Sequence, residues 1–258
     1  MVWIVAALAF AACGGDGPAS VAVDDGAPAP AAARTPAAAR TPTVVASDLV
    51  PSDLRGFAWP VDGACLPGSD DLMPNAPRPY RNGVHEGVDW YDRAGCARVE
   101  RGTAVKAMYR GVLVRADLDY QDLTPRTLAD LTARTAACSC SDAAILDAFR
   151  GRQVWIDHGN GIVSRYAHLS AIAAGIAAGA EVRQGQLIGA VGESGTPEFV
   201  TAPGTELHPH VEVRVGDSFL GAGLPPAQVR RLYERLFGVT ATATPTGTPA
   251  ATPTATAR

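Results

Sequence analysis

The chain has 258 residues, of which 47% are hydrophobic, so it can bury the core of one sizeable domain or of two small ones. Its 22 basic and 26 acidic residues give a formal net charge of −4 at pH 7. Nucleic-acid binding needs a basic surface that displaces counterions from phosphates, and the sequence contains no basic cluster. The composition therefore argues against a nucleic-acid-binding protein.

The first thirteen residues predict an export signal. Residues 1–12, MVWIVAALAFAA, form an apolar run much shorter than the roughly 20 residues that span a bilayer. This length is typical of a signal-peptide core. The run ends at Cys13, after FAA and before two glycines, which resembles the lipobox of bacterial lipoproteins. The resemblance implies a lipidated Cys13 and a lipid anchor in the membrane; a simple secretory cleavage is the alternative. Either one places the protein outside the cytoplasm.

Two low-complexity segments flank the centre of the chain. Residues 14–47 are rich in Ala, Pro and Thr, and residues 239–258 have a similar composition. Such segments bury too little apolar surface to offset the entropy of ordering. We expect a disordered linker, a disordered tail and one folded domain at 48–238.

Short apolar runs broken by glycine predict a mainly β domain with an antiparallel sheet or sandwich. The runs are TAVKAMY, GVLVRAD, RQVWIDH, GIVSRYAHL, QLIGAVG and HVEVRV. A helical insertion is expected at about 117–150, and a C-terminal helix at 225–237 begins with a proline pair. This last helix should turn four apolar residues toward one face: Val229, Leu232, Leu236 and Phe237.

Four cysteines lie in the predicted domain: Cys65, Cys96, Cys138 and Cys140. Their even number in an exported chain predicts disulfides, with three possible connectivities. We favour a Cys65–Cys96 bridge, which would join the segments on either side of residue 85. A bond between Cys138 and Cys140 would be strained, because only one residue separates them. A metal site at these two cysteines is an alternative.

The histidines supply the candidate site residues: His85, His158, His168, His208 and His210. In an extended strand, His85 and Asp89 would share a face, and so would His208 and His210, because each pair has an even separation. Two imidazoles and a carboxylate from two strands supply three ligands to Zn²⁺ and leave the fourth position for water, as in catalytic zinc sites. Each spacing alone is a weak signal, since a surface-turn histidine would show it too.

Five motifs in order are more specific: HEGVDW, GTAVKAMYRGVLVRAD, IDHGNGIVSRYAHLS, VRQGQLIGAVGESG and HPHVEVRV. Together, over about residues 80–216, they resemble the zinc peptidases of the lysostaphin and LytM type, peptidase family M23. The resemblance implies the antiparallel β fold of that family and one Zn²⁺ per chain. It assigns the metal ligands as His85, Asp89 and His210.

The resemblance also implies that His168 and His208 are catalytic histidines beside a metal-activated water. Glu212 lies on the same strand face as His210 and would orient an imidazole from behind the metal. His158 precedes a Gly-Asn-Gly turn and is expected to shape that hairpin. Pro209 lacks a backbone N–H, so we expect an edge strand or an irregular strand there.

By this resemblance the protein is a zinc endopeptidase that hydrolyses peptide bonds in bacterial peptidoglycan, in cell-wall remodelling or lysis. The alternative is a catalytically silent regulator of other wall hydrolases, which typically lacks a metal ligand, whereas all five site positions are filled here. A binding module with coincidental histidines is a third hypothesis. The insertion and a long segment at 193–207 are expected to reshape the groove and the substrate choice.

Overall fold

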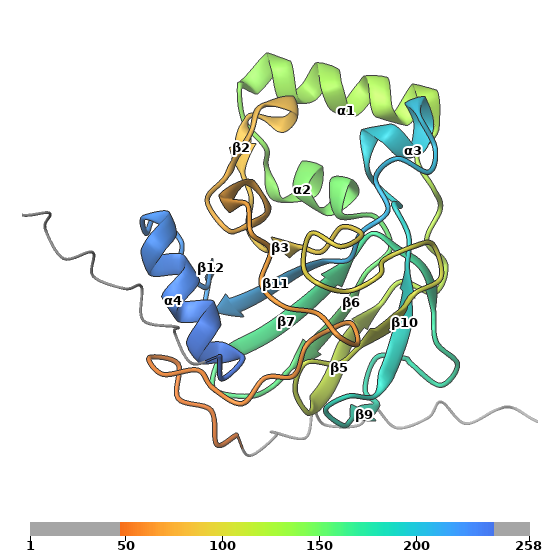
Figure 1. Ribbon diagram of the computed structural model, residues 1–258. Coiled ribbons are helices and arrows are strands. Elements are labelled where there is room, and N and C mark those ends of the chain that lie inside the picture. The colour runs from red at the N-terminus through yellow and green to blue at the C-terminus, as the bar shows by residue number, and fades with distance from the viewer. Residues whose placement is uncertain (1–46, 240–258) are drawn as a thin grey trace, which may run out of the picture. The chain divides into compact units, whose positions relative to one another are not determined.

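The computed structural model describes residues 47–239 (Figure 1). The predicted signal peptide with Cys13 lies outside these residues, as do nearly all of the predicted linker and tail. Within residues 47–239, no helix has both the length and the apolar character needed to cross a membrane.

The described chain forms strands, α-helices and two short 3-10 helices. The strands are β1 (Pro77–Arg78), β2 (Gly83–Val84), β3 (Val88–Asp89), β4 (Ala104–Lys106), β5 (Gly111–Ala116), β6 (Val154–Asp157), β7 (Ile162–Ala167), β8 (Leu169–Ile172), β9 (Glu181–Val182), β10 (Leu187–Val191), β11 (His210–Val215) and β12 (Ser218–Phe219). The helices are η1 (Asp70–Leu72), η2 (Pro79–Arg81), α1 (Pro125–Cys138), α2 (Ala143–Arg150), α3 (Pro197–Thr201) and α4 (Pro226–Leu236).

The largest sheet has the strand order β12-β11-β7-β6-β5-β9, and β3 also pairs with β11. A second sheet has the order β4-β10-β8. Every strand pair in both sheets is antiparallel. The predicted mainly β, antiparallel architecture with a helical insertion and a C-terminal helix is therefore confirmed.

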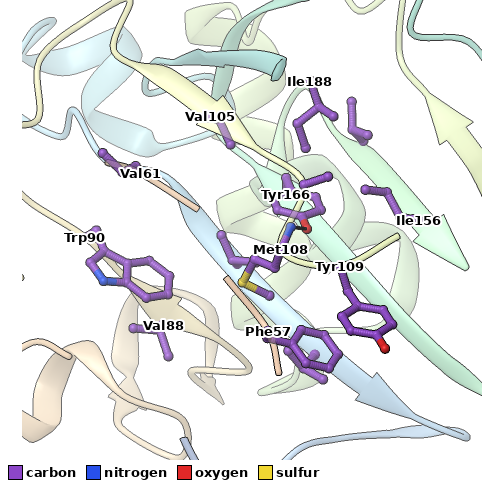
Figure 2. Close-up of a cluster of buried hydrophobic side chains, with 14 of the residues drawn as sticks. Phe57, Val61, Val88, Trp90, Val105, Met108, Tyr109, Ile156, Tyr166 and Ile188 are labelled. Carbon is purple, nitrogen blue, oxygen red and sulfur yellow. Dashed lines mark hydrogen bonds between the residues drawn. The ribbon is translucent and has the colours of Figure 1, made fainter. Parts of the chain in front are cut away.

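The apolar core lies between the sheets and the segments that pack on them (Figure 2). The Tyr166 hydroxyl is buried there and accepts a hydrogen bond from the Met108 N–H (2.7 Å). The alternation in β3 decides which residues enter this core, because successive side chains of a strand point to opposite faces. Val88 and Trp90 are buried in it, so Asp89 between them points to the other side. The same alternation in β11 buries Val211 and Val213 in the core.

Helix α4 covers part of the core with Val229, Tyr233 and Leu236, all fully buried. Leu232 and Phe237 pack against the core while partly buried. The apolar stripe predicted for this helix is therefore present, and Tyr233 belongs to it as well.

The helical insertion forms α1 and α2, which lie beyond one end of the sheets (Figure 1). Thr124 caps α1, Pro125 occupies its first turn, and Asp142 caps α2. Such caps satisfy N–H groups that the first helical turn leaves free. Helix α1 contacts both η2 and α3. The insertion therefore borders the same end of the sheets as the segment around residue 85.

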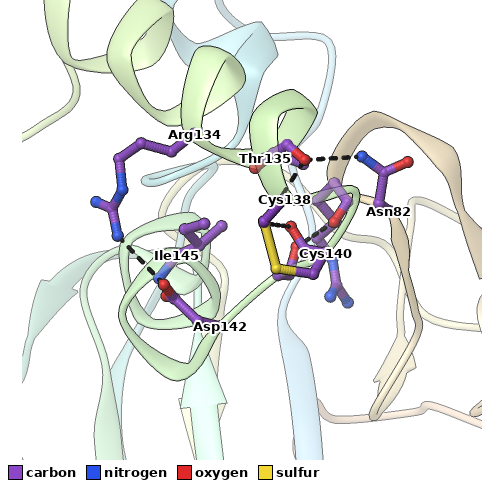
Figure 3. Close-up of a disulfide and its surroundings, with 9 residues drawn as sticks. Asn82, Arg134, Thr135, Cys138, Cys140, Asp142 and Ile145 are labelled. Atoms are coloured by element: carbon purple, nitrogen blue, oxygen red, sulfur yellow. Dashed lines mark hydrogen bonds and ion pairs between the residues drawn. A yellow bond between two sulfur atoms is a disulfide. The ribbon is translucent and has the colours of Figure 1, made fainter.

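Two disulfides are present, Cys65–Cys96 and Cys138–Cys140. The second lies at the turn between α1 and α2 (Figure 3). Beside it, the Asn82 side chain donates a hydrogen bond to the Thr135 carbonyl (3.1 Å). The turn is thereby joined to the loop that precedes His85.

Two details differ from the expectations. An edge strand at Pro209 is wrong: β11 is an interior strand that begins at His210, so Pro209 precedes the ladder and no ladder N–H is lost. The Pro209 carbonyl instead accepts a hydrogen bond from the Trp90 N–H (3.3 Å). The segment 193–207 contains a short helix, α3, that starts at Pro197 after the cap residue Thr196.

Candidate active site

Three ionisable side chains meet where β3 pairs with β11. Asp89 lies opposite His210 in the ladder, and His85 lies just before β3. The distances are 2.9 Å from His85 Nε2 to Asp89 Oδ1, 2.7 Å from His210 Nδ1 to Asp89 Oδ1, and 3.0 Å between the two ring nitrogens. The residues are only 2%, 4% and 6% exposed. Both members of the predicted 85/89 pair and one member of the 208/210 pair thus meet in one buried cluster.

Gly87 of the HEGVD motif permits this approach. A Cβ atom there would lie 2.4 Å from the Val211 carbonyl oxygen and 2.9 Å from the His210 ring. A side chain at this position would therefore push β3 away from β11, and the first motif needs glycine between its two candidate ligands.

Hydrogen bonds fix which nitrogen of each ring faces the cluster. His85 Nδ1–H donates to the Met73 carbonyl (3.0 Å), and His210 Nε2–H donates to Glu212 Oε1 (3.3 Å). The atoms left facing one another are His85 Nε2, His210 Nδ1 and Asp89 Oδ1. With the ring protons on His85 Nδ1 and His210 Nε2, each of the three atoms offers a lone pair to a shared cation. Burial lowers the pKa of His210, but the Asp89 and Glu212 carboxylates outweigh this and raise it, so a metal ion would displace a proton from the cluster.

The donor set fits a zinc ion. Zinc binds imidazole nitrogen and carboxylate oxygen at about 2.0–2.2 Å, which places tetrahedral ligands about 3.3–3.6 Å apart. The three atoms lie 2.7–3.0 Å apart, so they need to separate by several tenths of an ångström. His85, Asp89 and His210 are also the one group in residues 47–239 with at least three His, Cys, Asp or Glu ligand atoms close enough to share a metal ion.

Charge and burial act in opposite directions on these groups. Burial lowers the pKa of His85 to about 4, although the Asp89 carboxylate beside it works the other way. Burial favours a protonated Asp89, but the surrounding His85, His208 and His210 hold its pKa well below 3.8. Asp89 Oδ2 also accepts a hydrogen bond from the Arg78 guanidinium (3.0 Å), which orients the carboxylate.

Two further histidines border the cluster. His168 donates Nδ1–H to the Ser194 carbonyl (2.8 Å), and His208 donates Nδ1–H to the Glu206 carbonyl (2.8 Å). Their ring centroids are 4.7 Å apart, and His208 Nε2 lies 3.6 Å from Asp89 Oδ1. Burial lowers the pKa of both rings. Both are therefore neutral at pH 7, with Nε2 available as a proton acceptor.

The model of the family described as peptidase family M23 matches residues 83–220. The chain belongs to peptidase family M23. The match covers the motifs from His85 to the end of β11, so the whole cluster lies in the M23 domain. No curated protein sequence matches the chain.

Several solved structures are similar to this M23 chain. A Pseudomonas aeruginosa protein described as an M23 peptidase is 25% identical over 74% of this chain and 55% of its own, with a TM-score of 0.40. A zinc-containing peptidase from Vibrio cholerae is 21% identical over 67% of this chain and 41% of its own, with a TM-score of 0.40. This chain thus spans about half of either protein. The catalytic domain of lysostaphin from Staphylococcus simulans is 19% identical over 68% of this chain and 92% of its own, with a TM-score of 0.37.

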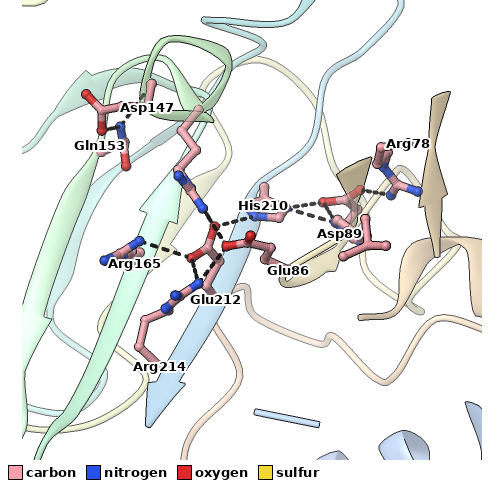
Figure 4. A network of polar contacts seen from close by, with 12 residues as sticks. Arg78, Glu86, Asp89, Asp147, Gln153, Arg165, His210, Glu212 and Arg214 are labelled. Atoms are coloured by element: carbon pink, nitrogen blue, oxygen red, sulfur yellow. Dashed lines mark hydrogen bonds and ion pairs between the residues drawn. The ribbon is translucent and has the colours of Figure 1, made fainter. Parts of the chain in front are cut away.

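Glu212 of the M23 domain lies in a buried network of charges (Figure 4). Three arginines surround it, at 2.5 Å from Arg150 Nε, 3.3 Å from Arg214 and 3.5 Å from Arg165. Although burial opposes ionisation, the hydrogen bond from His210 and the charge of Arg150 lower its pKa. Glu212 is therefore a carboxylate, and it faces the side of His210 away from the cluster.

A cleft of about 440 Å³ opens over the cluster. The insertion contributes Leu146 and Phe149 to its wall, η2 contributes Tyr80, and α3 contributes Pro197 and Glu198. The insertion and the 193–207 segment, which the sequence marked as unusual, therefore border the site directly.

His158 lies away from this cleft, as expected for a residue that shapes the β6–β7 hairpin. Its Nδ1–H donates to the Arg110 carbonyl (2.7 Å), and its Nε2 accepts from the Ser164 hydroxyl (2.8 Å). It is buried beside Phe57 and Tyr109. Both ring nitrogens are occupied, so this histidine offers no lone pair to a metal.

Three residues that support the site were not among those predicted from the sequence. Arg78 holds Asp89, Arg150 holds Glu212, and Tyr91 stacks on the His208 ring with centroids 4.3 Å apart. The Arg150 and Tyr91 contacts join segments far apart in the chain, and none of the three contacts follows a recognisable spacing. Tyr91 alone could have been suggested from the sequence, because it comes directly after Trp90 at the end of the first motif.

Proposed function

We propose that this M23 domain is a zinc-dependent endopeptidase that hydrolyses peptide bonds in bacterial peptidoglycan. M23 peptidases are zinc-dependent and act on peptidoglycan peptides, which supplies the substrate class. The observation that carries the proposal is the buried cluster of His85, Asp89 and His210, whose three possible ligand atoms lie within 4.8 Å of one another.

These three residues would hold the ion, and His168 and His208 would perform the proton transfers. When bound, Zn²⁺ supplies Lewis acidity, which makes water a nucleophile at neutral pH and polarises a carbonyl group. A histidine that takes the proton of the attacking water through Nε2 can pass it to the leaving amine. The other histidine also starts neutral, so it can donate to the developing oxyanion only once Nε2 has taken up a proton.

The surrounding residues keep these two rings in place. The Ser194 and Glu206 carbonyls hold the Nδ1–H groups, so each ring presents Nε2 to the reacting atoms. His168 has φ +60°, a left-handed conformation that residues other than glycine seldom adopt, and its N–H is fixed by the Arg150 carbonyl (2.9 Å). Tyr91 covers one face of His208. Both rings are thus oriented before substrate binds.

The deciding experiment has two measurements. Elemental analysis gives the bound zinc, and digestion of purified peptidoglycan gives the activity. Wild type is expected to contain about one zinc per chain and to release wall peptides, and His210→Ala is expected to lose both. His158→Asn is the matched control, because it removes a buried histidine of the same motif series outside the cleft and should keep both. A zinc-loaded wild type that releases no peptide would favour the catalytically silent regulator, and an active metal-free protein would refute the mechanism.

We also propose that the domain acts outside the cytoplasm as a lipoprotein anchored through Cys13. The support is the lipobox-like sequence, together with two disulfides in the folded domain. Metabolic labelling with a radioactive fatty acid should mark the wild type and not Cys13→Ser. Export of an unlabelled wild type would support a simple secretory cleavage instead.

A further inference from the structure

Arg150, the last residue of the helical insertion, forms hydrogen bonds with residues next to the candidate metal ligands and with one of the two histidines that border them. Its Nε donates to Glu212 Oε1 (2.5 Å), and a terminal nitrogen donates to Glu86 Oε2 (2.7 Å). Its backbone carbonyl accepts the N–H of His168 (2.9 Å). The side chain is 10% exposed, so these are buried contacts. The end of the insertion is therefore part of the scaffold behind the cluster.

The carboxylate oxygen that Arg150 binds is the same one that His210 binds. Glu212 Oε1 receives Arg150 Nε and faces His210 Nε2 at 3.3 Å, whereas the contacts from Arg165 and Arg214 go to Oε2. Without Arg150, both remaining cations would pull the carboxylate by its other oxygen. Oε1 would then leave His210 Nε2 without its acceptor.

We propose that Arg150 is a positioning residue for the metal ligand His210. By holding Glu212 Oε1 on the Nε2–H of the ring, it keeps the proton on Nε2 and the lone pair of Nδ1 toward Asp89. This inference rests on the proposed function only in taking His210 as a metal ligand. It makes the insertion, through its final residue, a requirement for tight metal binding.

The test measures zinc affinity by competition with a chromogenic chelator, which needs no activity assay. Hydrogen-bond partners of metal-binding histidines typically contribute a factor of about 10–100 in affinity. Arg150 acts on His210 only through Glu212, so Arg150→Gln should weaken zinc binding by about tenfold, the lower end of that range. Arg150→Lys, which keeps a buried positive charge beside Glu212, should recover part of it.

Arg115→Gln is the matched control. Arg115 also anchors α2, through Asp147 at 2.5 Å, but it does not contact Glu212. Removing it should loosen the insertion and leave zinc affinity within about twofold of wild type. An equal loss in this control would assign the effect to the insertion as a whole and overturn the role of Arg150.

A double-mutant cycle separates positioning from general destabilisation. In a Glu212→Gln background there is no carboxylate to hold, so Arg150→Gln should cost little further affinity. An undiminished effect in that background, or a folded Arg150→Gln with wild-type affinity, would overturn the inference. If the glutamine variant does not fold, Arg150→Lys carries the same cycle. Wild type that binds no zinc would refute the proposed function itself, whereas the two outcomes above would refute only the role of Arg150.

Discussion

Replacing His158 with asparagine should change how the stability of the domain depends on pH. His158 is 1% exposed, and burial lowers its pKa to about 4, although the Arg110 carbonyl and the Asp157 carboxylate partly oppose this. The folded protein therefore keeps the ring neutral at pH values where the unfolded chain, with a pKa of about 6.5, binds a proton. Asparagine does not titrate, so the variant loses this pH dependence.

The size of the effect follows from the shift. Each pKa unit corresponds to about 1.36 kcal/mol. Lowering the pKa of His158 from 6.5 to about 4 therefore corresponds to about 3 kcal/mol of unfolding free energy. In wild type, the contribution of the neutral His158 ring to the free energy of unfolding is fully present above pH 6.5. It declines as the pH falls toward 4 and does not change further below pH 4. At pH 7.5 the variant should be less stable by about 1–3 kcal/mol, because Ser164 loses its buried partner.

The assay is urea unfolding of both proteins, followed by circular dichroism from pH 7.5 to 4. Relative to the variant, the free energy of unfolding of wild type should fall by about 3 kcal/mol as the pH falls through this range, so the two values should meet or cross. The other buried histidines titrate in both proteins, so their contribution cancels in the difference. A difference independent of pH would show that the folded domain protonates His158 as readily as the unfolded chain does, and the buried neutral ring would be wrong.

Three other variants test separate contacts. Gly151→Ala should lower wall-digestion activity and cost at least about 1–3 kcal/mol, because φ +68° and ψ −142° favour glycine and the added Cβ would lie 2.2 Å from the Ser194 carbonyl. Gly175→Ala, also at positive φ but with open space around the added Cβ, is its control and should keep activity; equal activity loss in both would exclude the clash. Tyr91→Ala should slow wall digestion more than Tyr91→Phe, since only alanine removes the ring stacked on His208; two variants slowed equally would assign the role to the hydroxyl. Removing the Cys65–Cys96 disulfide, which closes a loop of 31 residues, should lower the free energy of unfolding in urea by about 4 kcal/mol, because the unfolded chain gains loop entropy. An unchanged urea midpoint would contradict this.

Much of the fold was predictable because its signals are local. The alternation of apolar residues in GVDW and HVEVRV indicated strands that bury one face, and the structure buries Val88, Trp90, Val211 and Val213. The proline pair before α4 predicted a helix start, and the helix begins at Pro226. The short helix α3 was missed, because the segment 193–207 combines its capping signal with several residues typical of turns.

The candidate site was likewise predictable only where its signals are local. Spacing alone offered two weak pairs of candidate ligands, and only the order of five motifs selected His85, Asp89 and His210 from them. The register that places Asp89 opposite His210 joins residues 121 apart, and no local pattern specifies it. Pro209 illustrates the limit, since proline marks a missing N–H but does not say whether a strand contains it or begins after it.

Local sequence patterns specify where the strands and capped helices form and which faces of β3 and β11 carry polar side chains, because these features depend on neighbours within a few residues. The support of the cluster by Arg78, Tyr91 and Arg150, and the particular residues with which the insertion lines the cleft, became visible only in the folded domain. Contacts between distant segments depend on how the sheets and the insertion pack together. That packing is a property of the whole domain, and no single stretch of the chain records it.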